Sequence, residues 1–281
     1  MKKILVTGAN GQLGSELQVL SEKDKQYEWI FADRTKIPLD NLDLLKTQLN
    51  DINPDVIFSC GAYTAVDKAE TEKEIAFKVN HLAVEVLAKY AKKNNVKLIH
   101  ISTDYVFDGT SSIALNEEAK TNPINVYGES KLAGEIACLK ENLDSIIIRT
   151  SWVYSKFGNN FVKTMQRLMQ ERDAINVVND QIGSPTYAAD LALAMLAVLE
   201  APKWIPGIYN YSNEGEISWY DFALAIKELG GYICEVGGIP SASYPTPAKR
   251  PEFSLLDKRK IKEVYNLDIP HYRESLKKMF E

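Results

Sequence analysis

The stretch KILVTGANGQLG, residues 3–14, decides the fold of this chain. An apolar, strand-like run leads into three glycines with the spacing GxxGxxG, at Gly8, Gly11 and Gly14, and a helical pattern begins immediately after them. Glycine lets the backbone turn sharply and approach a phosphate closely, and a helix N-terminus offers free N–H groups to that phosphate. A tight turn without a ligand is the alternative. A strand before the glycines and a helix after them are, however, the context in which such a turn holds a dinucleotide.

Short apolar runs and helical stretches alternate through the first half of the chain. The strand-like runs cover residues 3–7, 28–32, 55–60, 96–102 and 145–149, and the helical stretches cover residues 15–23, 42–51, 74–93 and 127–140. Nearly continuous apolar strands separated by helices are typical of a parallel sheet that is covered on both faces. With right-handed crossovers, this pattern predicts an α/β fold of the Rossmann type, a doubly wound parallel sheet.

The second half of the chain is less regular. Helices are expected near residues 159–172, 187–200 and 217–230, short strands near 175–178 and 207–211, and an irregular surface loop over 237–253. We therefore expect two domains. Residues 1–150, with about 172–202 packing back, would bind the dinucleotide, and residues 151–171 and 203–281 would form a smaller substrate-binding domain.

Composition and charge exclude several classes of protein. The 281 residues carry a formal net charge of -5 with no long run of one sign, so no nucleic-acid partner is expected. The three cysteines are far apart and odd in number, which argues against a disulfide framework and for a reducing compartment. The three histidines lack metal-ligand spacing, no apolar run could span a membrane, and the N-terminus does not resemble a signal peptide. We expect a cytoplasmic protein without a membrane partner.

An acidic residue follows the second predicted strand. Asp33 stands about 20 residues beyond the glycines, at the distance where an acid binds the adenosine ribose hydroxyls, which favours NAD. Arg34 follows directly and suits a 2′-phosphate, so use of NADP stays open. The alternative is that both residues only open a polar loop.

The segment NVYGESK, residues 125–131, places Tyr127 four positions before Lys131. On a helix these two side chains share a face. A lysine ammonium stabilises a phenolate and lowers the pKa of the phenol, which can then pass a proton to a carbonyl oxygen while a hydride reaches the carbon. Ser102 and Thr103 end the fourth predicted strand on the cofactor side, where the Thr103 hydroxyl can bind the same oxygen. A lone Tyr-x-x-x-Lys pair is common on helix surfaces, so the glycine turn upstream is what makes this pair informative.

These motifs together resemble a known family. TGANGQLG, the Ser-Thr pair and YGESK match the signatures of the extended short-chain dehydrogenase/reductases in the same order. A closer resemblance, to the dTDP-4-dehydrorhamnose reductases, rests on blocks at residues 62–70, 102–109, 125–135, 149–154, 158–165, 179–186 and 244–257. That family reduces the 4-keto group of dTDP-4-dehydro-L-rhamnose with NADPH or NADH, making dTDP-L-rhamnose for cell-surface polysaccharide. The resemblance therefore implies an NAD(P)H-dependent oxidoreductase with a nucleotide-sugar substrate, and it allows a homodimer.

The resemblance also implies roles for individual residues. Tyr127 resembles the proton donor, Lys131 the residue that tunes it and holds the nicotinamide ribose, and Thr103 the assisting hydroxyl. The residues implied at the cofactor are Gly8, Asn10, Gly11, Gln12, Leu13, Gly14, Asp33, Arg34, Asp40, Asn41, Ala62, Tyr63, Thr64, Ser102, Tyr127 and Lys131. The residues implied at the substrate are Thr103, Asp104, Trp152, Asn160 and Arg250.

Four of the substrate residues have a purely structural alternative. Trp152 would then belong to the core, Asp104 would cap the turn that follows it, Asn160 would cap a helix, and Arg250 would pair with a surface acid. Amide and guanidinium donors suit phosphate oxygens, which favours Asn160 and Arg250 at a nucleotide diphosphate.

Some members of the family hold a magnesium ion between subunits with glutamates. Glu16 matches one of these positions, and Asp190 stands where a second glutamate would be. A carboxylate of either kind suits a hard cation, but the third ligand has no counterpart, so no metal is predicted.

Two other functions stay open. A nucleotide-sugar epimerase or 4,6-dehydratase of the same superfamily would keep NAD bound, but the dehydratases place a further acid where this chain has Tyr105. The regulatory subunit of methionine adenosyltransferase also resembles these reductases and binds a partner without chemistry. The complete set of Thr103, Tyr127 and Lys131 argues against that function.

Overall fold

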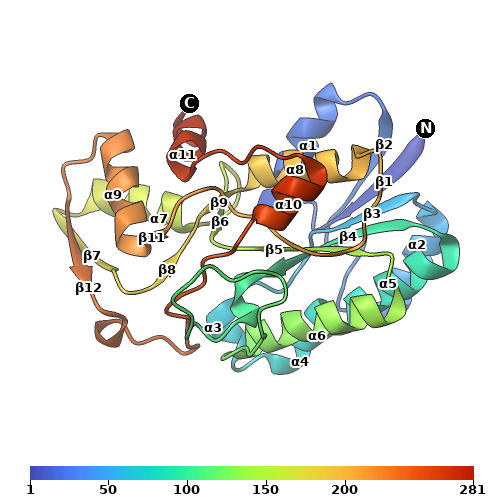
Figure 1. Cartoon of the computed structure of the whole chain (residues 1–281), viewed down its shortest axis with the longest axis horizontal. Helices are drawn as coiled ribbons and strands as arrows, with labels where there is room; N and C mark the ends of the chain where they lie inside the picture. Colours follow the sequence, from blue (N-terminus) through green and yellow to red (C-terminus); the bar gives the residue numbers. More distant parts are fainter.

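A six-stranded sheet organises the larger lobe of the computed structural model, which describes residues 1–281 (Figure 1). The strand order is β10-β5-β4-β3-β1-β2, and every neighbouring pair is parallel. The strands are β1 (Lys2–Thr7), β2 (Tyr27–Ala32), β3 (Val56–Ser59), β4 (Lys97–Thr103), β5 (Ile146–Thr150) and β10 (Gly207–Asn210). Every residue of β3 and β5 is buried, as continuous apolar runs in a doubly covered parallel sheet should be. The predicted Rossmann-type sheet is confirmed.

Helices cover both faces of this sheet. One face carries α1 (Gln12–Lys23), α8 (Ala188–Glu200) and α10 (Arg259–Tyr265), and the other carries α2 (Leu42–Ile52), α5 (Ala83–Asn94) and α6 (Val126–Glu141). Successive residues of β1 point to opposite faces, so Ile4 and Val6 join one core while Leu5 joins the other. The alternation of strand and helix thus fixes which strand ends meet at the same edge.

The long helix predicted over 74–93 is interrupted. It consists of α4 (Lys73–Phe77), a π-helical turn η1 (Lys78–Leu82) and α5. Within the π turn the buried Asn80 side chain accepts from the Tyr63 N–H at 2.8 Å and donates to the Tyr63 carbonyl at 3.0 Å and to the Ser130 hydroxyl at 3.0 Å. The π turn therefore fastens the segment after β3 to α6, a use that is common for π turns near functional sites.

A smaller lobe has its own hydrophobic core. Its strands form pairs: β7 (Ala174–Val178) with β12 (Glu235–Ile239), β8 (Ile182–Gly183) with β11 (Ile217–Ser218), and β6 (Val153–Tyr154) with β9 (Thr186–Tyr187). The helices α7 (Phe161–Glu171), α9 (Trp219–Gly230) and α11 (Tyr272–Phe280) pack around Tyr154, Phe222 and their neighbours. Short segments α3 (Val66–Ala69), η2 (Asp104–Val106) and η3 (Ser241–Ser243) complete the chain.

Three segments lie elsewhere than expected. β10, expected in the substrate domain with residues 203–281, is an edge strand of the main sheet, and its Tyr209 packs in that core. β7, expected to pack back onto the sheet, pairs with β12 in the smaller lobe. The predicted irregular loop over 237–253 begins inside β12. Short apolar runs do not encode their pairing partners, which is why the sequence misplaced them. The division into two domains remains a proposal.

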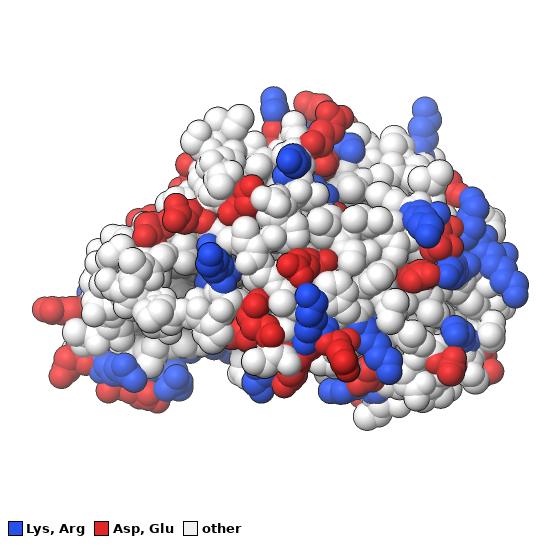
Figure 2. All heavy atoms as spheres, turned by 90° about the horizontal axis from the view of Figure 1, so that it is seen from below, with Lys and Arg blue, Asp and Glu red and all other residues white.

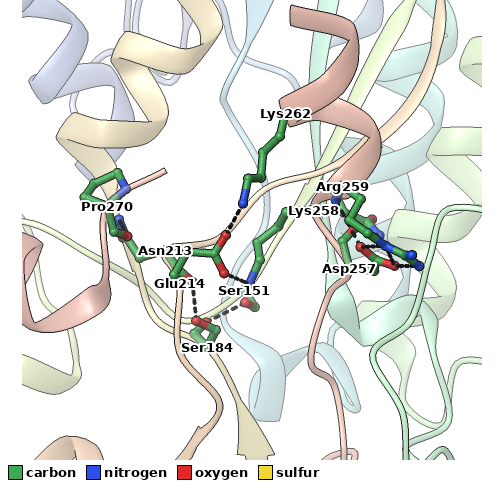
Figure 3. Close-up of polar contacts among 10 residues, drawn as sticks. Ser151, Ser184, Asn213, Glu214, Asp257, Lys258, Arg259, Lys262 and Pro270 are labelled. Carbon is green, nitrogen blue, oxygen red and sulfur yellow. Dashed lines mark hydrogen bonds and ion pairs between the residues drawn. The ribbon is translucent and has the colours of Figure 1, made fainter. Parts of the chain in front are cut away.

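The C-terminal part of the chain returns to the sheet through ion pairs. Glu214 lies between two lysines of the α10 region, with the Lys262 Nζ at 2.9 Å and the Lys258 Nζ at 3.2 Å (Figure 3). Asp257 and Arg259 form a further pair beside them. Together with the hydrogen bond from Lys260 on α10 to the Ile208 carbonyl of β10, these contacts hold α10 beside β10.

The surface charge is mixed. Basic and acidic side chains lie next to one another over the face seen in Figure 2, in agreement with a net charge of only -5. No helix has both the length and the apolar character needed to cross a membrane.

Candidate active site

A cleft of about 620 Å³ opens at the carboxyl ends of the main sheet strands. This is the edge at which open parallel sheets bind their ligands. The predicted residues that line it are Gly8, Asn10, Gly11, Gln12, Leu13, Gly14, Asp33, Arg34, Ala62, Thr64, Ser102, Thr103, Asp104, Tyr127, Lys131 and Trp152. Segments far apart in the sequence thus meet in one place, as the motifs predicted.

The glycine turn forms the floor of one end of the cleft. Gly8 has a φ of +68°, and a Cβ there would lie 2.5 Å from the Gly61 Cα, so no other residue fits without moving the backbone. The Gly11 N–H donates to the Gly8 carbonyl at 2.9 Å, and Gly11 starts α1 without any side-chain cap. The first N–H groups of α1 are therefore free to meet a phosphate, so this turn fits a dinucleotide cofactor.

The acid after β2 is oriented by its neighbours. Hydrogen bonds from the Thr35 hydroxyl, the Lys36 N–H and the Thr35 N–H hold the pKa of Asp33 below its usual range. Its second oxygen accepts from the Asn10 amide at 3.2 Å. Arg34 is largely exposed and pairs with Asp40. A charged, fixed carboxylate suits a ribose diol, and the adjacent guanidinium suits a phosphate.

The tyrosine and the lysine both lie on the first turns of α6, which is capped by Asn125 accepting from the Gly128 N–H at 2.8 Å. The buried Lys131 ammonium donates to the Ile101 carbonyl at 2.6 Å and lies 3.4 Å from the His100 Nε2. Burial lowers the pKa of Lys131 to about 8, against the opposing effect of Glu135. The ammonium therefore faces the end of β4 from inside the cleft.

The phenol of Tyr127 is more weakly acidic than expected. Burial raises the pKa of Tyr127 to about 12, although the Thr103 hydroxyl acts in the opposite direction. The prediction of a lowered pKa for Tyr127 is wrong for this structure, because desolvation outweighs any effect of the Lys131 ammonium, which donates to a strand carbonyl. A phenol with such a pKa keeps its proton at neutral pH and can act as a donor.

A buried carboxylate stands beside the Thr103 hydroxyl. Thr103 Oγ1 donates to Asp104 Oδ1 at 3.0 Å and accepts from the Tyr105 N–H at 3.2 Å. Burial raises the pKa of Asp104 to about 6, with the Ser254 and Thr103 hydroxyls acting in the opposite direction. Asp104 Oδ2 and the Ser102 hydroxyl are buried without a hydrogen-bond partner. Such orphaned polar atoms in a cleft indicate contacts that a ligand completes.

Three residues predicted at the cofactor do not line the cleft. The Tyr63 hydroxyl donates to Glu72 at 2.6 Å, so its ring points out of the cleft. Asn41 caps α2, and Asp40 pairs with Arg34 at its edge. The rule that ligands bind at the carboxyl ends of parallel strands, called the strand-end rule below, locates the backbone of these segments. It does not say on which side of the backbone a side chain lies.

Two residues predicted at the substrate diphosphate also lie outside the cleft lining. Asn160 caps α7, and its amide donates to Gln12 Oε1 at 2.9 Å. The Arg250 guanidinium makes two hydrogen bonds to the Asp67 carboxylate, at 3.0 and 2.8 Å. For both residues the structural alternative describes the contacts that they make, and Asp67 had not been predicted as a partner.

The sequence also missed part of the lining. The additional residues are Cys60, Gly61, Val66, Ile101, Tyr105, Thr150, Ser151, Val153, Gly158, Asn159 and Leu191. Cys60, Gly61 and Ser151 directly follow strands, so the strand-end rule could have found them. Leu191 comes from α8, and nothing in its local sequence indicates that it reaches the cleft.

The two carboxylates considered for a metal are already engaged. Glu16 accepts from the Ser155 hydroxyl at 2.6 Å, and Asp190 accepts from the Asn213 amide at 2.8 Å and from the Ser275 hydroxyl. No group of three or more His, Cys, Asp or Glu side chains gathers in the chain in a way that could hold a metal ion. The residues present do not fit a magnesium site within one chain.

The parallel sheet and the contents of this cleft place the chain among the short-chain dehydrogenase/reductases, oxidoreductases that use a nicotinamide cofactor. The particular family follows from comparison with known proteins. The family model described as the RmlD substrate binding domain matches residues 1–281, and the chain belongs to that family.

Named relatives match over nearly their whole length. A dTDP-4-dehydrorhamnose reductase of Aggregatibacter actinomycetemcomitans is 40% identical over 289 residues, which cover 99% of this chain and 98% of that protein. The spore coat polysaccharide biosynthesis protein SpsK of Bacillus subtilis is 37% identical over 281 residues, covering 100% of this chain and 98% of SpsK. A solved structure of the dTDP-4-dehydrorhamnose reductase of Bacillus anthracis in complex with NADP is 37% identical with a TM-score of 0.95, covering 100% of this chain and 99% of that one. The family resemblance read from the sequence is confirmed.

Proposed function

We propose that this protein reduces the 4-keto group of dTDP-4-dehydro-L-rhamnose to dTDP-L-rhamnose for the synthesis of a cell-surface polysaccharide, with NADPH or NADH as cofactor. One observation carries the proposal: Thr103, Tyr127 and Lys131 meet in a single cleft of a chain that matches the family over residues 1–281. The names of the relatives from Aggregatibacter and Bacillus subtilis support the substrate and the polysaccharide.

The cofactor, when bound, supplies the hydride. The glycine turn and the uncapped start of α1 would hold its diphosphate. Asp33 supports NADH because its carboxylate suits the ribose diol, whereas Arg34 and the NADP in the Bacillus anthracis relative support NADPH. We therefore propose that the cleft accepts both cofactors.

Tyr127 is the proposed proton donor. Its phenol is protonated at neutral pH, so it can give its proton to the sugar oxygen at C4. The phenolate left behind then needs a positive charge, which the Lys131 ammonium provides from the same helix. Thr103 would hold the same oxygen once its hydroxyl turns away from Asp104, which needs rotation about one bond only.

Substrate contacts are proposed at both ends of the sugar nucleotide. The unpartnered Asp104 Oδ2 would accept from a sugar hydroxyl, and the Trp152 ring would pack against the sugar. Asn160 and Arg250 would donate to the diphosphate. In the structure both are occupied by Gln12 and Asp67, so a diphosphate would have to replace these partners.

We also propose a cytoplasmic homodimer. The three cysteines are free thiols, which fits a reducing compartment. The Leu193 side chain on α8 is 54% exposed, an apolar surface that a second copy could cover. Light scattering coupled to gel filtration measures the molar mass directly, and a mass equal to the monomer would contradict the dimer.

The deciding experiment follows the loss of reduced nicotinamide absorbance with dTDP-4-dehydro-L-rhamnose generated in place. We expect one cofactor to be oxidised for each dTDP-L-rhamnose formed, with both NADPH and NADH. An epimerase or dehydratase would form a sugar product without net oxidation of the cofactor. If the protein bound the cofactor but oxidised none of it, the partner-binding function would replace the reductase.

A further inference from the structure

The backbone of Trp152 is strained. It has a φ of +47°, in the left-handed region that bulky residues avoid. Trp152 stands two residues after β5 and lines the cleft, and the carbonyl of the next residue, Val153, accepts from the Gln12 amide of the cofactor turn at 3.2 Å. Strain of this kind persists only where surrounding contacts hold the residue, and it gathers at functional sites. The contacts that hold Trp152 therefore determine the position of part of the cleft wall.

The backbone on either side of Trp152 is held by a buried polar chain. The Ser151 hydroxyl donates to the Ser184 carbonyl at 2.6 Å, and the Ser184 hydroxyl donates to the Asn213 carbonyl at 2.5 Å (Figure 3). The Trp152 carbonyl accepts from the Thr186 N–H at 3.3 Å. These bonds fix the backbone, but they leave the indole ring free to rotate.

The ring itself is held by the β8–β11 pair of the smaller lobe. The Trp152 and Trp219 rings are stacked, with centroids 3.7 Å apart and planes 13° apart. Gly183 pairs with Ile217 and leaves room for the ring, since a Cβ on Gly183 would lie 2.9 and 3.0 Å from two indole atoms of Trp152. The indole is thus confined by residues that do not line the cleft, apart from its own neighbours in the chain.

Trp219 is in turn fixed from behind. It is the first residue of α9, directly after the Ser218–Asp221 capping box, whose hydrogen bonds measure 2.9 and 3.1 Å. Its other ring neighbours are Phe161 at the start of α7, with centroids 4.6 Å apart, and Phe222 on α9, with centroids 6.5 Å apart. A capped helix start and a packed aromatic neighbour give Trp219 little freedom, so it can act as a rigid support.

We propose that Trp219 is a positioning residue for the reaction: it holds the Trp152 indole in place as the wall of the sugar end of the cleft. This rests on the proposed function, because Trp152 is there assigned to the sugar. Trp219 does not line the cleft, so we expect its loss to act on the sugar nucleotide through the Trp152 ring and to leave cofactor binding unchanged. The smaller lobe thereby sets the shape of a site whose reacting groups belong to the larger lobe.

The test uses Trp219→Leu and Trp219→Phe, with Trp204→Phe as the matched control. Trp204 donates to the Asp144 carbonyl at 2.7 Å and lies outside the cleft lining. Circular dichroism should show an exciton couplet from the stacked indoles in wild type and Trp204→Phe, and lose it in both Trp219 variants. We expect Trp219→Leu to weaken binding of dTDP-L-rhamnose roughly tenfold or more, and Trp219→Phe to weaken it less. NADPH binding should not change.

A second variant approaches the same ring from Gly183. Gly183→Ala should displace the Trp152 indole and raise the dissociation constant for dTDP-L-rhamnose in the same way, with the couplet altered but Trp219 intact. Wild-type binding of dTDP-L-rhamnose by Trp219→Leu, or a loss of NADPH affinity equal to the loss of sugar-nucleotide affinity, would overturn the positioning role alone. A wild-type protein that binds NADPH but no dTDP-L-rhamnose would remove the proposed substrate, and the positioning role with it.

Discussion

The two ends of the cleft are built in different ways. The cofactor end consists of backbone at the ends of adjacent parallel strands: the turn after β1, Asp33 after β2 and Ala62 after β3. The proposed sugar end is assembled from remote segments. Trp152 there stacks on Trp219, and the Ser254 hydroxyl acts on the pKa of Asp104, with more than sixty residues between the partners in each case.

The two ends therefore depend on different features of the chain, one on backbone geometry and the other on individual side chains. At the cofactor end, the sheet register and a glycine turn place free N–H groups, so few single side chains are essential to its shape. At the sugar end, each contact depends on a particular side chain and on the docking of the smaller lobe. Substitutions should therefore divide into those that disturb the sheet and those that change only recognition of the sugar.

The largest expected effect lies where the two ends meet, at Tyr127. Tyr127→Phe removes the proposed proton donor but keeps the ring and its edge-to-face contact with Tyr105, whose centroid is 5.5 Å away. We expect kcat to fall by about 10²–10⁴-fold, while the dissociation constant for NADPH stays unchanged. Steady-state kinetics and fluorescence titration measure the two quantities separately.

Tyr90→Phe is the matched control, because it removes a hydroxyl from α5 that does not line the cleft. Wild-type kcat is expected for that variant. If the Tyr127→Phe variant had the wild-type kcat, another group would have to supply the proton, and the reaction would not take place at Tyr127.

The next largest effect is expected on the stability of the larger lobe. Arg149 on β5 and Glu135 on α6 form a buried pair, with side chains only 3% and 2% exposed and N–O distances down to 2.7 Å. Glu135→Gln leaves the Arg149 charge uncompensated, so the free energy of unfolding should fall by about 3–5 kcal/mol. Urea unfolding measures this loss.

Glu129→Gln on the same helix provides the comparison, because Glu129 makes only an exposed ion pair with Lys73 at 3.5 Å. Its effect on unfolding should stay below about 1 kcal/mol. Equal losses of unfolding free energy from the two substitutions would mean that the buried pair does not stabilise the packing of α6, the helix that carries Tyr127 and Lys131.

The same contrast explains how much the sequence predicted. The parallel sheet built from the first five strands, the glycine turn and the position of Asp33 follow from local patterns of two to seven residues, and the structure places them as predicted. The Trp152–Trp219 stack and the Arg250–Asp67 pair join segments whose separation carries no periodic signal. Such contacts arise only when the lobes pack, so single-chain patterns cannot indicate them.

The pKa of Tyr127 shows a second limit. The four-residue spacing predicted that Lys131 and Tyr127 share a helix face, and both do line the cleft. The sequence could not indicate that the ammonium would donate to the Ile101 carbonyl, or that burial would outweigh its charge. The sign of a pKa shift depends on desolvation, which requires the three-dimensional surroundings.

A smaller effect tests the chemistry of the sugar end through pH. We expect kcat/KM to fall as the pH drops through about 6, because protonation of Asp104 removes an acceptor for the sugar hydroxyls. It should also fall as the pH rises through about 8, because Lys131 then loses the charge that supports the Tyr127 phenolate. Initial rates across this range give both limbs.

Asp104→Asn should remove the acid limb and leave the alkaline limb in place. The contribution of Asp104 to the free energy of unfolding also changes with pH, in the direction opposite to that of a salt-bridged acid. A buried carboxyl with a raised pKa stabilises the fold below its unfolded value of 3.8, and that contribution is lost as the pH rises through about 6. Asp104→Asn should therefore unfold less easily than wild type at neutral pH. An unchanged acid limb would mean that another group titrates there.

The smallest expected effect distinguishes two roles of Asn160, as the cap of α7 and as a ligand of the diphosphate. Asn160 accepts from the Lys163 N–H at 3.0 Å as the cap of α7, while its amide donates to Gln12 and to the Ser155 carbonyl. Asn160→Ala removes the cap and the amide, whereas Asn160→Ser keeps a capping oxygen and removes only the amide. The free energy of unfolding should fall by about 1 kcal/mol in the alanine variant and by much less in the serine variant.

If Asn160 also serves the diphosphate as proposed, both variants should raise KM for the sugar nucleotide by the same small factor, since both lack the amide. A KM that changes only in the alanine variant would assign Asn160 to the cap alone. Because Gln12 belongs to the cofactor turn and Asn160 to the smaller lobe, a change in the KM for NADPH in both variants would be informative as well. It would mean that the Asn160–Gln12 hydrogen bond couples the two ends, which would then no longer respond independently to substitution.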